Sequence, residues 1–109
     1  MVPDLDLAAI RNYCERRVPP EARDQVRVEA QVSQNAVTIV ERRAPWHEDA
    51  DGWSEHPVVR LRYTVKSGLW ALYWRDRNER WHRDRSGPAA SVHILLDEID
   101  HDPTGIFWG

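Results

Sequence analysis

The hydrophobic pattern opens with a helical period. Leu7, Ile10 and Cys14 recur at helical spacing, which predicts a helix over residues 4–18 that ends before a pair of prolines. Asp4 or Asp6 at its start is expected to accept hydrogen bonds from the free amides of the first turn. The cysteine falls on the apolar stripe, so it is expected to be a buried, unreactive thiol.

From residue 26 the period of the pattern is two. Apolar and polar side chains alternate over residues 26–32, which predicts a half-buried strand, and residues 36–42 predict a second strand rich in β-branched side chains. Ser33, Gln34 and Asn35 form the turn between them, with a positive φ expected at Asn35.

Three more strands are predicted over residues 58–66, 69–74 and 80–83. Ser67 and Gly68 are expected to be the two central residues of a hairpin turn, which sets Val65 opposite Trp70. A similarly tight turn at residues 76–78 sets Trp74 opposite Trp81.

The last element is a helix for which Ser91 is the expected cap, followed by an apolar ending that can pack back on the body. Its apolar face comprises Val92, Leu95, Leu96 and Ile99. The order predicts an α+β fold: a five-stranded antiparallel meander flanked by an N-terminal and a C-terminal helix. A chain of 109 residues fits a single domain spanning residues 1–109.

The predicted strands have two different faces. One face gathers apolar and aromatic side chains and is the expected core: Val59, Leu61, Tyr63, Val65, Trp70, Leu72, Trp74 and Trp81. The other interleaves basic groups with an aromatic ring, and its candidate nucleic-acid-binding residues are Arg60, Arg62, Lys66, Tyr73, Arg75, Arg80 and His82. Such a face can follow a phosphate backbone while the tyrosine stacks on a base.

The charge distribution leaves two alternatives to nucleic-acid binding open. Residues 58–85 hold eight basic and three acidic groups, but the whole chain carries a net charge of −3, unlike most nucleic-acid modules. The basic face is therefore also explained as the solvated side of an antiparallel sheet. Alternatively, the acidic residues 97–102 cover it, from the same chain or from a partner.

Residues 44–57 predict a long acidic loop that contains Trp46 and Trp53. Aromatic anchors in exposed segments often carry interfaces, so these two tryptophans are candidate partner-binding residues. The alternative is a lid in which both rings fold over the core.

Catalytic and metal chemistry have weaker support. The five histidines do not occur at the spacing of a zinc site, and the acidic loop is better explained by solvation than by metal binding. No metal or cofactor is therefore expected. The single cysteine also permits no internal disulfide. A small enzyme would use His82, oriented by Asp84, together with Tyr73 and Arg80, but no serine or cysteine nucleophile accompanies them.

The start of the chain lacks the basic and apolar regions of a signal peptide, and the longest apolar stretch, residues 69–74, is too short to cross a bilayer. A cytoplasmic location without a membrane partner is therefore expected.

Several stretches together resemble one known family. They are Leu61-Arg62-Tyr63, residues 69–78 (LWALYWRDRN), Arg80-Trp81-His82 and residues 102–108 (DPTGIFW), with residues 23–29 (RDQVRVE) and 38–43 (TIVERR) fitting as well. The sequence resembles the bacterial family DUF3024, a domain of unknown function, and departs from it at Glu79, where a glycine is expected. The resemblance implies a small bacterial protein without an assigned activity, and it transfers no catalytic or binding residue.

The leading functional hypothesis from the sequence is a non-enzymatic binding module that contacts another protein or a second copy of itself. Nucleic-acid binding through the basic face is the alternative hypothesis.

Overall fold

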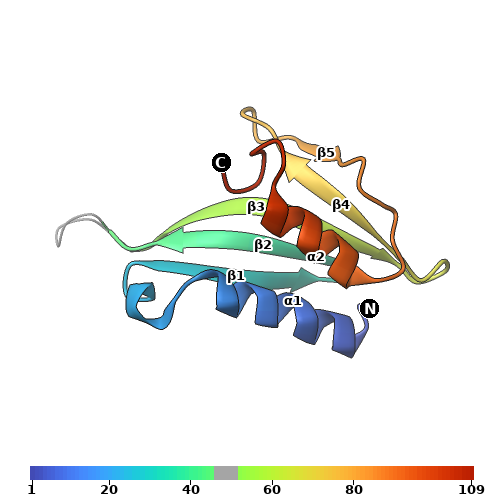
Figure 1. Ribbon diagram of the computed structural model, residues 1–109, viewed down its shortest axis with the longest axis horizontal. Coiled ribbons are helices and arrows are strands. Elements are labelled where there is room, and N and C mark those ends of the chain that lie inside the picture. Colours follow the sequence, from blue (N-terminus) through green and yellow to red (C-terminus); the bar gives the residue numbers. More distant parts are fainter. Residues whose placement is uncertain (46–51) are drawn as a thin grey trace.

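A computed structural model describes residues 1–45 and 52–109 (Figure 1). The elements, in chain order, are α1 (Asp4–Arg17), the 3-10 turn η1 (Pro20–Ala22), β1 (Val26–Ser33), β2 (Ala36–Arg43), β3 (Ser54–Thr64), β4 (Leu69–Arg75), β5 (Trp81–Arg83) and α2 (Val92–His101). In this described part of the chain, the five strands form one antiparallel sheet in the order β1-β2-β3-β4-β5. The predicted α+β fold, a meander with a helix at each end, is confirmed.

Helix α1 has the charges that its dipole favours, with Asp4 and Asp6 in the first turn and Arg16 and Arg17 in the last. The predicted side-chain cap is wrong, because Pro3 occupies the N-cap position and no side chain caps the helix. One aspartate has a tertiary partner instead: the indole Nε1 of the buried Trp70 donates to Asp6 Oδ2 over 2.8 Å.

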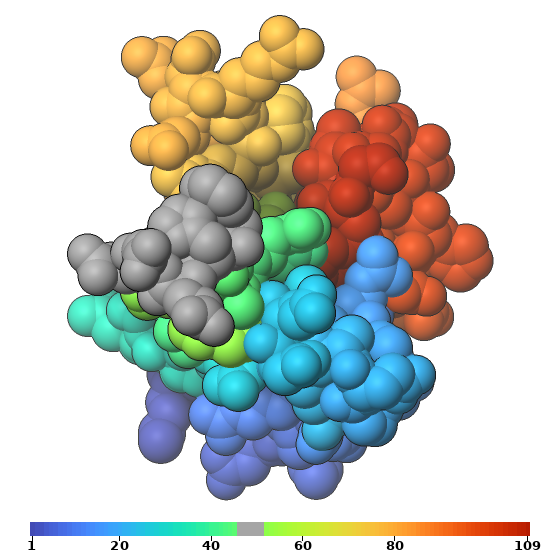
Figure 2. Space-filling view, turned by 90° about the vertical axis from the view of Figure 1, so that its left-hand side faces the viewer, coloured from blue at the N-terminus to red at the C-terminus, as the bar shows by residue number. Residues whose placement is uncertain are grey.

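Both helices cover the same face of the sheet. Figure 1 shows α2 crossing the strands while α1 runs alongside β1. In Figure 2 the orange-red C-terminal part of the chain lies next to the blue N-terminal part, which contains α1. The core between the layers includes Ile10, Tyr13 and Cys14 of α1, the predicted apolar face of α2, and the inward side chains Val28, Val37, Ile39, Val59, Leu61, Trp70 and Leu72. Phe107 and Trp108 pack against this core, as the apolar ending predicts.

The hairpin between β3 and β4 is longer than predicted. Thr64 pairs with Leu69, and Tyr63, not Val65, pairs with Trp70. Residues 65–68 form the loop, in which the Gly68 amide donates to the carbonyl of Thr64 and Val65 is 61% exposed. A displacement of two residues keeps every side chain on its own face, so this hairpin loses only Val65 from the predicted core.

The turn between β4 and β5 is one residue longer than predicted, so the observed pairing of β4 with β5 differs from the predicted pairing by one residue. Trp74 pairs with His82 and Arg75 pairs with Trp81, so the predicted pairing of the two tryptophans is wrong. Because side chains alternate across a strand, this change exchanges the two faces of β5. Trp81 lies on the face away from the helices, and His82 lies on the helix side.

Two further predictions are corrected. Strand β3 begins at Ser54, so residues 54–57 belong to the sheet and not to the acidic loop. A register irregularity between Ile39 and Val40 accompanies this extension. In the first hairpin Gln34, not Asn35, has the positive φ of 52°. Residues 46–51 of the predicted loop lie outside the described residues.

Candidate nucleic-acid interface

The sheet face opposite the helices carries a group of basic and aromatic side chains on its last three strands. The cross-strand pairs Arg60–Tyr73, Tyr73–Arg83 and Arg75–Trp81 bring these residues together. We call this surface the basic outer face and define it by Arg60, Arg62, Tyr73, Arg75, Trp81 and Arg83. Arg62 and Arg83 are exposed, and the other four are half-buried.

Trp81 lies among guanidinium groups. The Arg60 guanidinium carbon is 4.5 Å from the ring centroid and that of Arg75 is 5.9 Å away, distances at which a cation is attracted to the ring. Arg60 Nε also donates to Thr38 Oγ1 over 3.3 Å. These contacts place two guanidinium groups over the Trp81 ring.

The positive charge of Arg75 is only partly neutralised. Its guanidinium is 3.5 Å from a carboxylate oxygen of Glu79, whose side chain is 78% exposed, so the ion pair is well solvated. The buried Arg75 Nε has no hydrogen-bond partner among the described residues. On β1 and β2, the same face of the sheet has more evenly matched positive and negative charges, because Arg42 pairs with Glu29 at 3.5 Å. The excess positive charge is therefore concentrated on the basic outer face.

The structure brings four of the predicted nucleic-acid-binding residues together and separates three from them. Arg60, Arg62, Tyr73 and Arg75 share the basic outer face. Lys66 lies in the loop before β4 and Arg80 in the turn before β5, at opposite ends of strand β4. His82 lies on the other side of the sheet. The acidic residues 97–102 belong to α2 and the segment after it, on the helix side, so in this chain they do not cover the basic outer face.

Trp81 and Arg83 were missed by the sequence prediction because their face depends on the length of the preceding turn. Asp76 Oδ1 accepts hydrogen bonds from the amides of Asn78 and Arg80 at 2.8 and 2.9 Å, and this holds a wide turn. The Asp-Arg-Asn sequence signals a turn but not the number of residues in it.

His82 does not join the predicted catalytic group. Its ring stacks on Trp74 with centroids 4.6 Å apart, and its Nε2 lies 2.5 Å from Asp76 Oδ2. This hydrogen bond is the main reason why the pKa of Asp76 is lowered from its ordinary value. Asp84 accepts from the Ser86 amide over 2.9 Å, and the carboxylate that contacts His82 is Asp76. Tyr73 lies on the opposite face of the sheet from His82.

Of the two candidate partner-binding tryptophans, only Trp53 is among the described residues. It is half-buried, and the guanidinium carbon of Arg27 on β1 lies 4.6 Å from its ring centroid. Trp46 lies outside the described residues.

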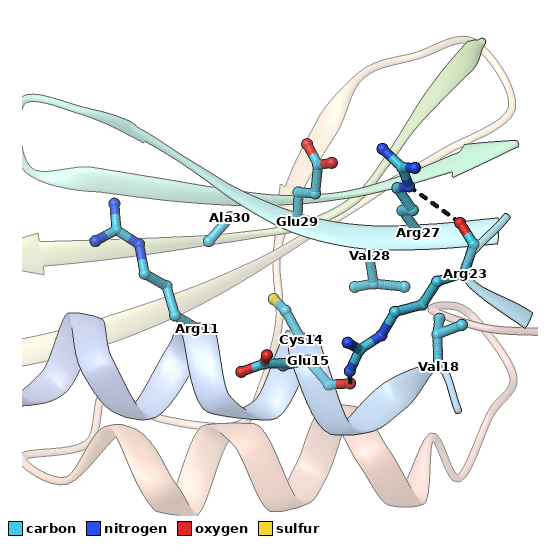
Figure 3. A pocket seen from close by; sticks show the side chains of 9 residues that line it. All are labelled: Arg11, Cys14, Glu15, Val18, Arg23, Arg27, Val28, Glu29 and Ala30. Atoms are coloured by element: carbon cyan, nitrogen blue, oxygen red, sulfur yellow. Dashed lines mark hydrogen bonds between the residues drawn. The ribbon is translucent and has the colours of Figure 1, made fainter. Parts of the chain in front are cut away.

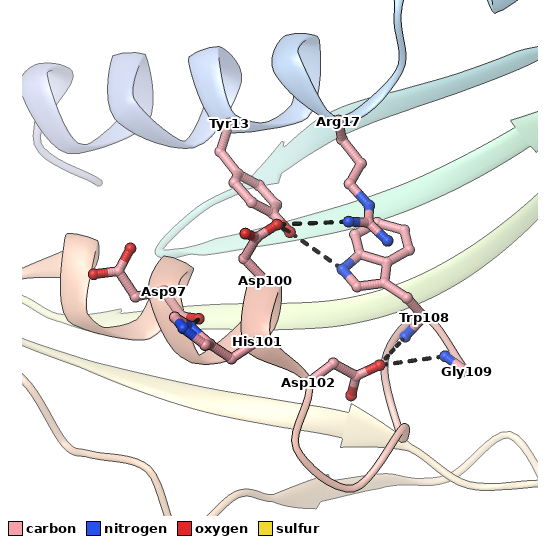
Figure 4. Close-up of polar contacts among 8 residues, drawn as sticks. All are labelled: Tyr13, Arg17, Asp97, Asp100, His101, Asp102, Trp108 and Gly109. Carbon is pink, nitrogen blue, oxygen red and sulfur yellow. Dashed lines mark hydrogen bonds and ion pairs between the residues drawn. The ribbon is translucent and has the colours of Figure 1, made fainter.

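A second polar cluster fixes the end of the chain against α1 (Figure 4). Trp108 Nε1 donates to the Tyr13 hydroxyl over 3.1 Å, and the Arg17 guanidinium lies 4.4 Å from the Trp108 ring centroid and 3.5 Å from Asp100. Burial raises the pKa of Tyr13 to about 12. The Asp102 carboxylate accepts the amides of Phe107 and Trp108 at 3.0 and 2.8 Å.

A hollow of about 440 Å³ lies between α1 and β1 (Figure 3). Cys14, Val18, Val28 and Ala30 supply its apolar lining, and charged side chains including Arg11 and Glu15 surround them. Burial raises the pKa of the Cys14 thiol to about 12, which keeps it protonated and fits the predicted unreactive cysteine.

Within residues 1–45 and 52–109, no three potential metal-ligating side chains come together as a site. In the same residues, no helix has the length and apolar character needed to cross a membrane.

Comparison with known proteins gives one match. No curated protein and no solved structure matches the chain significantly. The family described as domain of unknown function (DUF3024) matches residues 2–109, nearly the entire sequence, which confirms the family that the sequence motifs resemble. This protein therefore belongs to the DUF3024 family.

Proposed function

We propose that this protein is a non-enzymatic binding module whose basic outer face binds single-stranded nucleic acid. The observation that carries the proposal is the position of Trp81, which gives the open face of the sheet a second aromatic ring beside four arginines. Neither helix covers this face.

The chemistry of the face suits an extended, unpaired strand. Exposed Arg62 and Arg83 are placed to contact phosphates, since guanidinium groups bind phosphate oxygens in a bidentate manner. Tyr73 and the Arg60 guanidinium over Trp81 can stack on bases, as aromatic rings and guanidinium planes do in proteins that bind single strands. A duplex conceals its bases, so it offers this face only its phosphates.

The net charge of −3 does not oppose this function as strongly as the sequence alone indicated. Acidic groups such as Asp97 and Asp100 lie on α2, on the helix side of the sheet. The repulsion that they exert across the molecule is screened within about 10 Å at moderate salt. Binding is expected to be modest and to weaken steeply as salt rises.

Fluorescence anisotropy with labelled, mixed-sequence oligonucleotides tests this proposal at low and moderate salt. The variant pair is Arg62→Ala with Arg83→Ala, and the matched control is Arg11→Ala with Arg16→Ala, which removes the same charge from α1. We expect the first pair to weaken single-strand binding about tenfold. It should also reduce the slope of log affinity against log salt concentration by the equivalent of about two phosphate contacts. The control pair should change the affinity less than about threefold.

Stacking is tested separately with Tyr73→Leu, which keeps an apolar side chain on β4. Loss of a stacked base is expected to weaken single-strand binding by about tenfold and to leave weak duplex binding unchanged. Absence of binding at low salt, or an equal loss in the control pair, would contradict the proposal.

Protein binding or self-association remains the second candidate function. Its support is the half-buried Trp53 against Arg27, which places an aromatic ring beside the open edge strand β1.

A further inference from the structure

The sheet has two unequal edges, formed by β1 and β5. Strand β5 is three residues long, which is a common way to protect an edge. Strand β1 has eight residues, pairs continuously with β2, and contains neither proline nor glycine. Its charged side chains, Arg27 and Glu29, both point to the outer face, so no inward charge blocks the edge. Strand β1 therefore lacks three of the usual protections against pairing with another strand, namely a short length, a proline and an inward charge.

The register of the first hairpin identifies the backbone groups at this edge. The Ala44 amide donates to the Gln25 carbonyl over 2.8 Å. Because hydrogen bonding alternates along an antiparallel pair, Arg27, Glu29 and Gln31 direct their N–H and C=O groups toward β2. The groups that point away belong to Val26, Val28, Ala30 and Val32. In the described part of the chain, no hydrogen bond reaches them.

The helix layer leaves space next to this edge. The hollow of about 440 Å³ between α1 and β1 has Val28 and Ala30 on its strand side and Cys14 and Val18 on its helix side (Figure 3). The inward side chains of an added strand would point toward this hollow. The edge thus offers hydrogen-bonding groups and an apolar space to the same occupant.

We propose that the occupant is a second copy of the chain, whose β1 pairs antiparallel with this β1 around a two-fold axis at Val28. This deepens the self-association candidate and does not depend on nucleic-acid binding. In this register Arg27 lies opposite Glu29 of the second copy, and symmetry makes the ion pair twice. The two sheets join into one continuous sheet, with all helices on the same side.

Charge selects this register over its neighbours. An axis at Glu29 sets the two copies of Glu29 against each other, and an axis at Arg27 does the same for the arginines. An axis at Ala30 pairs Glu29 with Gln31, so neither Arg27 nor Glu29 faces a side chain of opposite charge. Arg27 is exposed and the Glu29 side chain is 41% exposed, so a second copy can reach both. Within the chain Arg27 contacts Trp53 and Glu29 pairs with Arg42, and the added ion pairs would form beside these contacts.

Sedimentation equilibrium over a wide concentration range, without nucleic acid, tests the proposal. The wild-type chain is expected to approach twice its monomer mass as concentration rises. Arg27→Glu and Glu29→Arg are each expected to raise the dimer dissociation constant about tenfold or more, since each creates two like-charge contacts. The double variant R27E/E29R restores opposite charges in the proposed register, so its dissociation constant should return to within about threefold of the wild type.

A second pair of variants tests the backbone contact. Ala30→Pro removes an edge amide that β2 does not use and should abolish the dimer, whereas Ala30→Ser keeps that amide and should dimerise. Near-ultraviolet circular dichroism of the tryptophans verifies folding in every variant. The nucleic-acid pair, Arg62→Ala with Arg83→Ala, should dimerise normally, so the two proposals can fail independently.

Three results would overturn the inference. The first is a wild-type chain that is monomeric at all concentrations. The second is an Ala30→Pro variant that is folded and still dimerises. The third is a double charge variant that dimerises as weakly as the single variants.

Discussion

Single backbone conformations explain features of this protein that side-chain chemistry does not. Glu79 has a φ of 65°, in the left-handed region, within the turn held by Asp76. A residue with a Cβ pays about 1 kcal/mol or more in this region, while glycine adopts it freely. The structure thus accounts for the glycine that the family resemblance leads one to expect at this position. The Glu79 carboxylate offsets little of the strain, because its contact with Arg75 is exposed.

Replacing this residue gives a direct prediction. Glu79→Gly should raise the free energy of unfolding by about 0.5–1 kcal/mol, measured by urea denaturation. The matched variant Glu79→Ala removes the same carboxylate but keeps the strained Cβ, so it should give no gain. Equal stability of the two variants would show that strain at this position is unimportant.

Residue-level signals also mark the limit of the sequence prediction. Apolar spacing correctly predicted the buried face of α2, because a helix has a fixed period. In α1 it predicted the buried Ile10 and Cys14, but Leu7 is only partly buried and the buried Tyr13 was not predicted. The side on which Trp81 and His82 lie could not be predicted, because it depends on whether the preceding turn has an even or odd number of residues. Hydrogen bonds from two amides to Asp76 accompany that number, and the residue types in the turn do not specify which amides the carboxylate accepts.

At the scale of elements, the end of α2 is connected to the final segment by one carboxylate. Asp102 is the C-cap of α2, with a φ of 44°, and its side chain accepts the amides of Phe107 and Trp108. The sequence predicted that the apolar ending would pack back. It did not predict this attachment, because an aspartate before a proline is also common in open turns.

Replacing Asp102 tests this attachment. Asp102→Gly accommodates the left-handed conformation but lacks an acceptor, so it should lower stability by about 1–2 kcal/mol and speed hydrogen exchange at the amides of Phe107 and Trp108. Asp102→Asn keeps one acceptor oxygen and should lie between Asp102→Gly and the wild type. Unchanged exchange at both amides in the glycine variant would show that apolar packing alone holds the segment.

For the whole molecule, two buried acids of α1 determine the response to alkaline pH. Burial raises the pKa of both Tyr13 and Cys14 to about 12, from ordinary values of 10.0 and 9.0. Between the ordinary and raised values, the folded protein holds protons that the unfolded chain releases, so stability falls as pH rises.

Urea denaturation across alkaline pH checks this response. The free energy of unfolding should be level below about pH 9 and decline steadily above it. In Cys14→Ala only Tyr13 remains, so the decline should begin about one pH unit higher, near its ordinary pKa of 10.0. A wild-type stability that is constant up to pH 11 would contradict this explanation.

The joining of the two ends of the chain has a consequence for protein synthesis. Tyr13 and its hydrogen-bond partner Trp108 are 95 positions apart in sequence, and α2 supplies the other half of the core that α1 faces. While a ribosome is still making the strands, the apolar stripe of α1 has no helix to pack against. The nascent chain therefore completes its core only after residues 92–108 have left the exit tunnel, and until then its first helix is a ready target for a chaperone.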